Sequence, residues 1–256
     1  MASFSRTYVF GFATAICVVC SVAVAGVSLS LREKQDINKE RDLRSNILSA
    51  VGLPEGGESL EGEAIDRMWE ERIQQRFITA EGEPATESLD QDGDGDLDSD
   101  DLTIARQKVK NEPDATPAVL GVYVRVDGET DAALAIPLDG NGLWGPLSGY
   151  LALDPRAKEV TGATFFAPKE TPGLGAEIME DPFEQQWIGK EVVDDSGATE
   201  PVRVVKGQAA TLCADDVEHC VDGVSGATIT SRGVDEMVER ALDWYDPYLG
   251  IRRTSR

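Results

Sequence analysis

The chain has 256 residues and a formal net charge of −23, with 47 acidic side chains against 24 basic ones. This length accommodates one domain of ordinary size together with additional segments. So large a negative charge repels phosphate backbones, which argues against nucleic acid as a partner. A single histidine and the lack of a Ser-His-Asp or Cys-His arrangement argue against a hydrolase.

An uncharged stretch near the N-terminus predicts a membrane anchor. Residues 7–31 contain no Asp, Glu, Lys or Arg. A helix of about 20 residues crosses the hydrocarbon core of a bilayer, whereas the apolar region of a cleaved signal peptide has about 7–15. We therefore expect residues 1–31 to be a short tail and a retained transmembrane helix. More basic residues follow this stretch than precede it, so counting positive charges alone places the C-terminal side in the cytoplasm.

A helical connector is predicted over residues 32–84. Apolar residues recur at helical spacing in 32–51, and charged residues cover the other faces. A second helix is expected over about 63–77, where five apolar residues share one side: Ile65, Met68, Trp69, Ile73 and Phe77.

The next segment, 85–113, is acidic, and its centre fits the twelve-position calcium loop. The stretch DQDGDGDLDSDD places a glycine, Gly95, at the sharp turn of position 6 and an aspartate rather than a glutamate at position 12. Dockerin-type loops resemble this pattern. We predict Ca²⁺ binding, with a solvated acidic loop as the alternative. The candidate ligands are Asp90, Asp92, Asp94, Asp96, Asp98 and Asp101.

The remaining segment, 114–256, predicts an α+β domain built on a mixed sheet. Several runs rich in β-forming residues are separated by Asp-Gly and Gly breaks, and a helix-like stretch around 176–190 interrupts them. An apolar stripe over 234–245 predicts a final helix, for which Thr230 or Ser231 is the expected N-cap.

Two of the four cysteines, Cys213 and Cys220, flank a short acidic loop in this domain. In an oxidising compartment they could close a disulfide, and free thiols are the alternative. A metal site with His219 lacks a fourth ligand.

The tetrad [Ser/Thr]-Gly-Ala-Thr occurs three times, at 161–164, 196–199 and 225–228. The first leads into a predicted strand and the second suits a hairpin turn. Only the third stands immediately before a predicted helix. Unpaired amide groups at a helix start favour an anion, so a phosphate ester fits best on the threonine that ends this third tetrad, Thr228.

The stretch DGVSGAT around this threonine resembles the recognition pattern of proteins that a flavin transferase modifies. The resemblance implies that this enzyme moves FMN from FAD onto the Thr228 hydroxyl as a phosphodiester. A hydroxyl is needed as the nucleophile, and small residues let a second active site approach the backbone. The other two tetrads have Lys158 and Val193 where this one has an aspartate. The motif residues are Asp222, Gly223, Ser225, Gly226 and Ala227.

Further stretches extend the resemblance to nearly the whole chain. KQDINKERDLRSNIL behind the anchor, GNGLWGPLSGYLAL at 140–153 and KETPGLGAEI at 169–178 are similar to NqrC, the covalent-FMN subunit of the bacterial sodium-translocating NADH:quinone reductase. RnfG, of the related ion-motive Rnf complex, shares the flavin motif and is the alternative. Relative to NqrC, residues 85–110 are an insertion.

The resemblance implies an electron relay in the bacterial inner membrane, beside the other membrane subunits of the complex. It places the FMN domain on the periplasmic side, against the charge count. The chain has no G-x-G-x-x-G after a strand and hence no visible NADH site of its own. The resemblance also brings four residues near the flavin: Trp144, Thr171, Leu174 and Gly175.

Structural roles compete with some of these assignments. A core position is the alternative for Trp144, and a Pro-Gly turn is the alternative for the segment around Thr171. Lys206 and Gly207 are a candidate neighbour of an anion, but a lysine at a strand end is usually only solvated, so they are left out of the predicted site. For the whole chain, two other classes remain, which are a membrane-anchored calcium-dependent binding module and a redox-inactive assembly subunit.

Overall fold

The computed structural model describes residues 5–55, 61–109, 112 and 115–254. The chain divides into two compact units, one up to Leu43 and the other from Arg44 onwards. The predicted boundary at 113–114 lies outside the described residues.

The first unit is the N-terminal part of one long helix, α1, which begins at Arg6 and ends at Ala50. Its stretch Thr7–Arg32 is long and apolar enough to cross a membrane, and no other helix in the described residues is. The apolar side chains of this stretch are exposed, as are the free thiols of Cys17 and Cys20. The predicted anchor and the first predicted connector helix therefore form one continuous helix.

A five-stranded antiparallel sheet in the order β1-β2-β3-β4-β5 forms the centre of the second unit. Each strand pairs with the next one along the chain. Short connections join β2 to β5, as antiparallel pairing allows. The connection from β1 to β2 is much longer and contains the aspartate loop, η1 Glu87–Leu89 and α3 Ser99–Val109. The predicted α+β class is confirmed. The strands are β1 Ile73–Thr79, β2 Val119–Asp127, β3 Thr130–Asn141, β4 Pro146–Leu153 and β5 Val160–Phe166.

The predicted helix over 63–77 is wrong in its last third, over residues 73–77. Helix α2 spans Glu63–Arg72, and the chain then enters β1, in which Ile73 lies opposite Arg125. The spacing of the apolar residues suited a helix. However, the unpaired edge of β2 offers hydrogen bonds to the following residues, and β-branched side chains such as Ile78 fit a half-buried sheet. The sheet thus includes a strand from the segment predicted as a helical connector.

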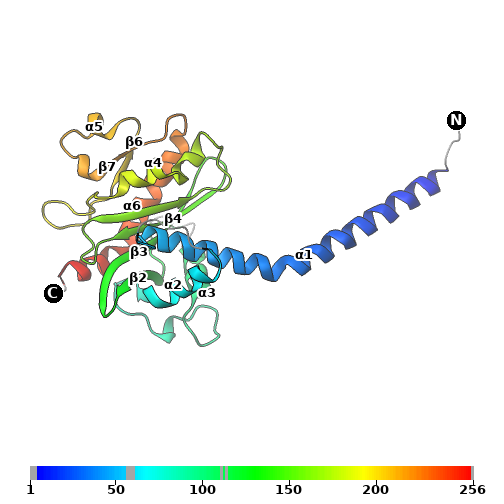
Figure 1. Ribbon diagram of the computed structural model, residues 1–256, viewed down its shortest axis with the longest axis horizontal. Coiled ribbons are helices and arrows are strands. Elements are labelled where there is room, and N and C mark those ends of the chain that lie inside the picture. Colours follow the sequence, from blue (N-terminus) through cyan, green and yellow to red (C-terminus); the bar gives the residue numbers. More distant parts are fainter. Residues whose placement is uncertain (1–4, 56–60, 110–111, 113–114, 255–256) are drawn as a thin grey trace. The chain divides into compact units, whose positions relative to one another are not determined.

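Helices cover the two faces of the sheet (Figure 1). Helix α6, Thr228–Thr254, packs on one face, and the Tyr245 hydroxyl donates a hydrogen bond to the Gly121 carbonyl at 2.7 Å. On the other face, Ile47 and Leu48 from residues 44–50 of α1 pack with Ile65 of α2 against Tyr123. Fully burying one such Leu or Ile contributes about 1.5–3 kcal/mol.

The predicted helix-like stretch around 176–190 is a series of short turns rather than one helix. Pro182 and the close packing of aromatic rings limit each piece to about one turn. Trp187 is fully buried and contacts Phe165 and Phe183. The pieces are η2 Gly175–Met179, α4 Asp181–Glu184 and η3 Gln185–Trp187.

A small second sheet lies beside the N-terminal part of α6 (Figure 1). Its strands, β6 Arg203–Val205 and β7 Cys220–Asp222, pair in parallel. The connection between them contains the short helices α5 Ala209–Leu212 and η4 Val217–His219. Since β7 leads directly towards α6, this small sheet places the third tetrad.

Candidate functional site

Thr228 is the first residue of α6, and its side chain is exposed. The predicted N-caps, Thr230 and Ser231, lie inside the first turn instead, because the helix begins earlier than the apolar stripe suggests. The Ser231 hydroxyl still accepts a hydrogen bond from the Val224 amide at 3.0 Å, and the Ser231 amide donates to the Ala227 carbonyl at 2.9 Å. These bonds fix the turn that presents Thr228.

The two glycines of the motif are needed for different reasons. Gly226 has a φ of +79°, a left-handed conformation that residues with a Cβ rarely adopt. Gly223 approaches β6 so closely that a Cβ would lie 2.6 Å from the Val205 carbonyl oxygen. Ser225 is exposed and Ala227 is buried. The motif therefore forms a tight turn between β7 and α6.

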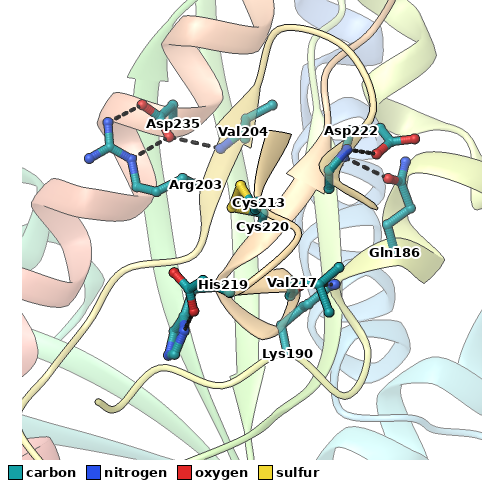
Figure 2. The surroundings of a disulfide bond; sticks show 12 residues. Gln186, Lys190, Arg203, Val204, Cys213, Val217, His219, Cys220, Asp222 and Asp235 are labelled. Carbon is teal, nitrogen blue, oxygen red and sulfur yellow. Dashed lines mark hydrogen bonds and ion pairs between the residues drawn. A yellow bond between two sulfur atoms is a disulfide. The ribbon is translucent and has the colours of Figure 1, made fainter. Parts of the chain in front are cut away.

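The motif aspartate, Asp222, fastens a neighbouring segment to this turn. Its carboxylate accepts a hydrogen bond from the Ala209 amide at 2.6 Å, and its own amide donates to Gln186 Oε1 at 2.8 Å (Figure 2). Ala209 begins α5, so the residues just before it, 206–208, are held beside the motif.

A cavity of about 620 Å³ opens beside Thr228. Two cationic side chains line it, Lys206 before α5 and Arg232 one turn after Thr228. Neither has an ion-pair partner among the described residues. Lys206 directly follows β6 and is exposed, as expected of a lysine at a strand end, and it also lines the cavity of the candidate site. Arg232 was missed. The other lining residues are Val204, Gly207, Gln208, Asp222, Gly223, Val224, Ser225, Gly226, Ser231 and Asp235.

The acidic side chains of the cavity are already engaged. Asp222 binds the Ala209 amide, and Asp235 accepts hydrogen bonds from the Arg203 guanidinium and from the Val204 amide (Figure 2). The hydrogen bond with Asp235 raises the pKa of Arg203, although burial acts against it. Asp235 is thus paired with a cation, whereas Asp222 keeps its negative charge in the cavity that Lys206 and Arg232 also line.

Cys213 and Cys220 form a disulfide between the residue after α5 and the first residue of β7 (Figure 2). His219 does not join them in a metal site, because both ring nitrogens are occupied. Nδ1 binds Asp216, and Nε2 donates to the Val193 carbonyl at 3.0 Å. Burial lowers the pKa of His219, but these hydrogen bonds outweigh burial and raise it overall.

The four predicted flavin neighbours do not line the cavity, and three of them, Trp144, Thr171 and Leu174, are exposed. Trp144 lies between β3 and β4 with 64% of its surface exposed, so the core alternative is wrong. Leu174 is 42% exposed and contacts the turn at Gly226. The Thr171 carbonyl accepts hydrogen bonds from the Leu174 and Ala176 amides, as in the predicted turn, and Gly175 is buried.

The aspartate loop brings three of its carboxylates together. Ligand atoms of Asp90, Asp92 and Asp94 lie within 4.8 Å of one another. Amide donors from Gly93 and Gly95 hold the pKa of Asp90 below its usual range. Asp96 and Asp98 are exposed, whereas Asp101 is fully buried and accepts a hydrogen bond from the Asp98 amide at 2.9 Å. The predicted exiting helix is α3, Ser99–Val109.

The chain contains an FMN-binding domain, as its match to a known family shows. The family of that description matches residues 142–243, which include Thr228 and the predicted flavin neighbours.

Similarity to known proteins over most of the chain identifies the particular family. The chain is 37% identical over 235 residues to NqrC, a subunit of the Na⁺-translocating NADH-quinone reductase, from Yersinia pestis, and the match covers 86% of this chain and 82% of the relative. It is 33% identical to NqrC of Pseudomonas aeruginosa over 97% of both chains. The solved structure of the same subunit from Parabacteroides distasonis matches with a TM-score of 0.69 at 30% identity, over 88% of this chain and 98% of that one. The chain belongs to the NqrC family of Na⁺-translocating NADH-quinone reductase subunits.

Proposed function

We propose that this chain relays electrons within a Na⁺-translocating NADH:quinone reductase through FMN esterified to Thr228. The observation that carries the proposal is an exposed threonine hydroxyl at the start of α6, beside a cavity lined by two cations without ion-pair partners among the described residues. The family membership supports the same function. Because these relatives are NqrC proteins over most of the chain, the Rnf alternative and the calcium-dependent binding module are not favoured.

The residues around Thr228 fit a phosphate group. The first amide groups of α6 have no partner within the helix, and the helix dipole is positive at this end. Lys206 and Arg232 supply two full positive charges from separate elements. Together these groups would hold the phosphate of the ester and offset its charge.

The attachment reaction makes one bond and breaks one. The Thr228 oxygen attacks the phosphorus on the flavin side of FAD, forming the new O–P bond. The pyrophosphate bond breaks, and AMP leaves with the bridging oxygen. The hydroxyl proton passes to a base of the flavin transferase, because the described residues near Thr228 offer no unengaged base. The tight turn at Gly226 leaves the hydroxyl accessible to that second active site.

When bound, FMN supplies the redox chemistry that the chain's own side chains lack. The exposed rings and methyl groups of Trp144 and Leu174 are the apolar surface available to the flavin ring. Electrons would pass between the flavin and the neighbouring membrane subunits of the complex, and the flavin transferase is a partner during maturation only.

We further propose that the chain is anchored in the bacterial inner membrane with its flavin domain on the periplasmic side. The apolar stretch Thr7–Arg32 has the length of a membrane span. The Cys213–Cys220 disulfide supports an oxidising compartment for the second unit. The N-terminal tail is too short for its charge to weigh strongly against this orientation.

A calcium ion at the aspartate loop is a separate proposal, supported by the three converging carboxylates and the buried Asp101 at position 12. Adding CaCl₂ should raise the melting temperature of the wild-type chain and leave that of Asp92→Asn little changed. The matched control is Asp195→Asn, which removes an exposed acid outside the loop. Equal responses of all three proteins, or the same response to MgCl₂, would refute a calcium site.

Coexpression with a flavin transferase tests the attachment. Wild-type chain and Thr228→Ser should run as flavin-fluorescent bands on a denaturing gel, because both keep a hydroxyl. Thr228→Val, which has nearly the same shape, should lose all covalent fluorescence. The control Thr164→Val alters the equivalent residue of the first tetrad, which lies in β5, and should stay fluorescent. Fluorescence retained by Thr228→Val would contradict the proposal.

A further inference from the structure

Glu170 is a buried acid, 6% exposed, in the segment between β5 and η2. One carboxylate oxygen, Oε1, accepts a hydrogen bond from the Trp144 amide at 2.8 Å. The other, Oε2, accepts one from the Thr230 hydroxyl at 2.7 Å. Burying a carboxylate is costly unless it is hydrogen-bonded, and such charge-assisted bonds are stronger than neutral ones. The position therefore calls for a specific explanation.

Two glycines leave the space that this carboxylate occupies. A Cβ on Gly142 would lie 2.5 Å from Oε1, and a Cβ on Gly175 would lie 2.4 Å from Oε2. Neither glycine has a left-handed φ, so conformational freedom does not explain them. Gly175, predicted as a flavin neighbour, acts here by making room for Glu170.

Glu170 thereby joins three segments, one of which begins with Thr228. These are the β3–β4 link with Trp144, the segment with Leu174, and the first turn of α6. Burial does not fix the β3–β4 link, since Leu143 is 49% exposed and Trp144 64% exposed. Within the link, the Gly142 amide donates a hydrogen bond to the Gly145 carbonyl. The Trp144 amide donates instead to Glu170, which ties the link to the rest of the domain.

We propose that Glu170 is a positioning residue for the flavin. It fixes the exposed apolar side chains of Trp144 and Leu174 relative to the threonine that bears the ester, so that the ring is held in one orientation. The inference rests on the proposed attachment at Thr228. Glu170 does not carry the flavin, but it determines how the flavin ring is held.

Two substitutions separate geometry from charge. In Glu170→Gln, the amide oxygen can still accept from the Trp144 amide, and the amide nitrogen can donate to the Thr230 hydroxyl. In Glu170→Ala, both partners lose their bond. The matched control is Glu177→Ala, which removes an exposed acid from the adjoining element, η2.

The chains are coexpressed with the flavin transferase and compared in two ways. Hydrogen exchange at the Trp144 amide, which needs no flavin, should be about tenfold faster in Glu170→Ala, because a charge-assisted bond is lost. Visible circular dichroism reports how the attached flavin is held. It should fall at least twofold in Glu170→Ala, with the covalent flavin content unchanged. Glu170→Gln and Glu177→Ala should match wild type in both measurements.

The inference would be overturned if Glu170→Ala carried covalent flavin and matched wild type both in hydrogen exchange at the Trp144 amide and in visible circular dichroism. That result would leave the proposed attachment at Thr228 intact. A wild-type chain without covalent flavin would overturn both. If Glu170→Ala does not fold, Thr230→Val tests the inference instead. It removes one of the two hydrogen-bond donors to Glu170 and keeps the shape of the side chain. An unchanged flavin signal in folded Thr230→Val would then count against the inference.

Discussion

Two cations from different elements set the local charge around Thr228. Lys206 follows β6, and Arg232 stands one helical turn beyond Thr228 in α6. The whole chain has a net charge of −23, so its long-range field disfavours an anionic substrate. Charges separated by more than about 8–10 Å are largely screened by physiological salt. The charge that a phosphate meets at the cavity is therefore set by the residues that line it, which are Lys206 and Arg232 together with the carboxylates of Asp222 and Asp235.

Removing either cation should slow attachment of the flavin without preventing it. We expect Lys206→Gln and Arg232→Gln each to lower the initial rate of FMN incorporation roughly tenfold, the factor for about 1.4 kcal/mol of charge-assisted hydrogen bonding. The measurement is the growth of covalent flavin fluorescence with purified transferase and FAD. Lys158→Gln, an exposed lysine outside the cavity, is the control. Rates equal to wild type in both variants would contradict a phosphate-binding role.

At the scale of elements, the connection between β6 and β7 forms one wall of the cavity. It has little secondary structure of its own, and specific links hold it instead. Asp222 binds its Ala209 amide, and the disulfide ties Cys213 to the start of β7 (Figure 2). The motif aspartate and the disulfide therefore stabilise the same wall.

The disulfide should contribute to the stability of the second unit. Replacing Cys213 with Ser should lower the free energy of unfolding by about 2–3 kcal/mol, the value expected for closing a loop this short. Chemical denaturation under non-reducing conditions measures the change. Cys17→Ser, which alters a free thiol in α1, should leave the stability unchanged. Reduction of the wild-type protein should reproduce the effect, and equal stability of oxidised and reduced protein would contradict it.

The sequence predicts the strong patterns of the fold and misses the contacts between distant segments. The strands after residue 118 and the final helix follow from alternation and from an apolar stripe. Strand β1 is missed because its apolar spacing also suits a helix, and only the open edge of β2 decides between them. Local sequence placed Thr228 at a helix start. It could not show that Glu170 is buried, since its partners lie 26 and 60 residues away.

For the whole molecule, the proposed function gives the apolar helix and the FMN-binding domain a common role. The stretch Thr7–Arg32 would keep the second unit at the membrane, where the other subunits of a quinone reductase lie. A covalent ester would keep the cofactor on the protein in a compartment where free FMN is scarce. On the proposed function, the chain would receive its electrons from a partner protein of the complex.

The intact mass of the protein purified from its native host tests the central claim most directly. We expect the polypeptide mass plus one FMN minus one water, with the added mass confined by proteolysis to the peptide that contains Thr228. A polypeptide that carries no added mass, or an FMN located on another peptide, would contradict the account.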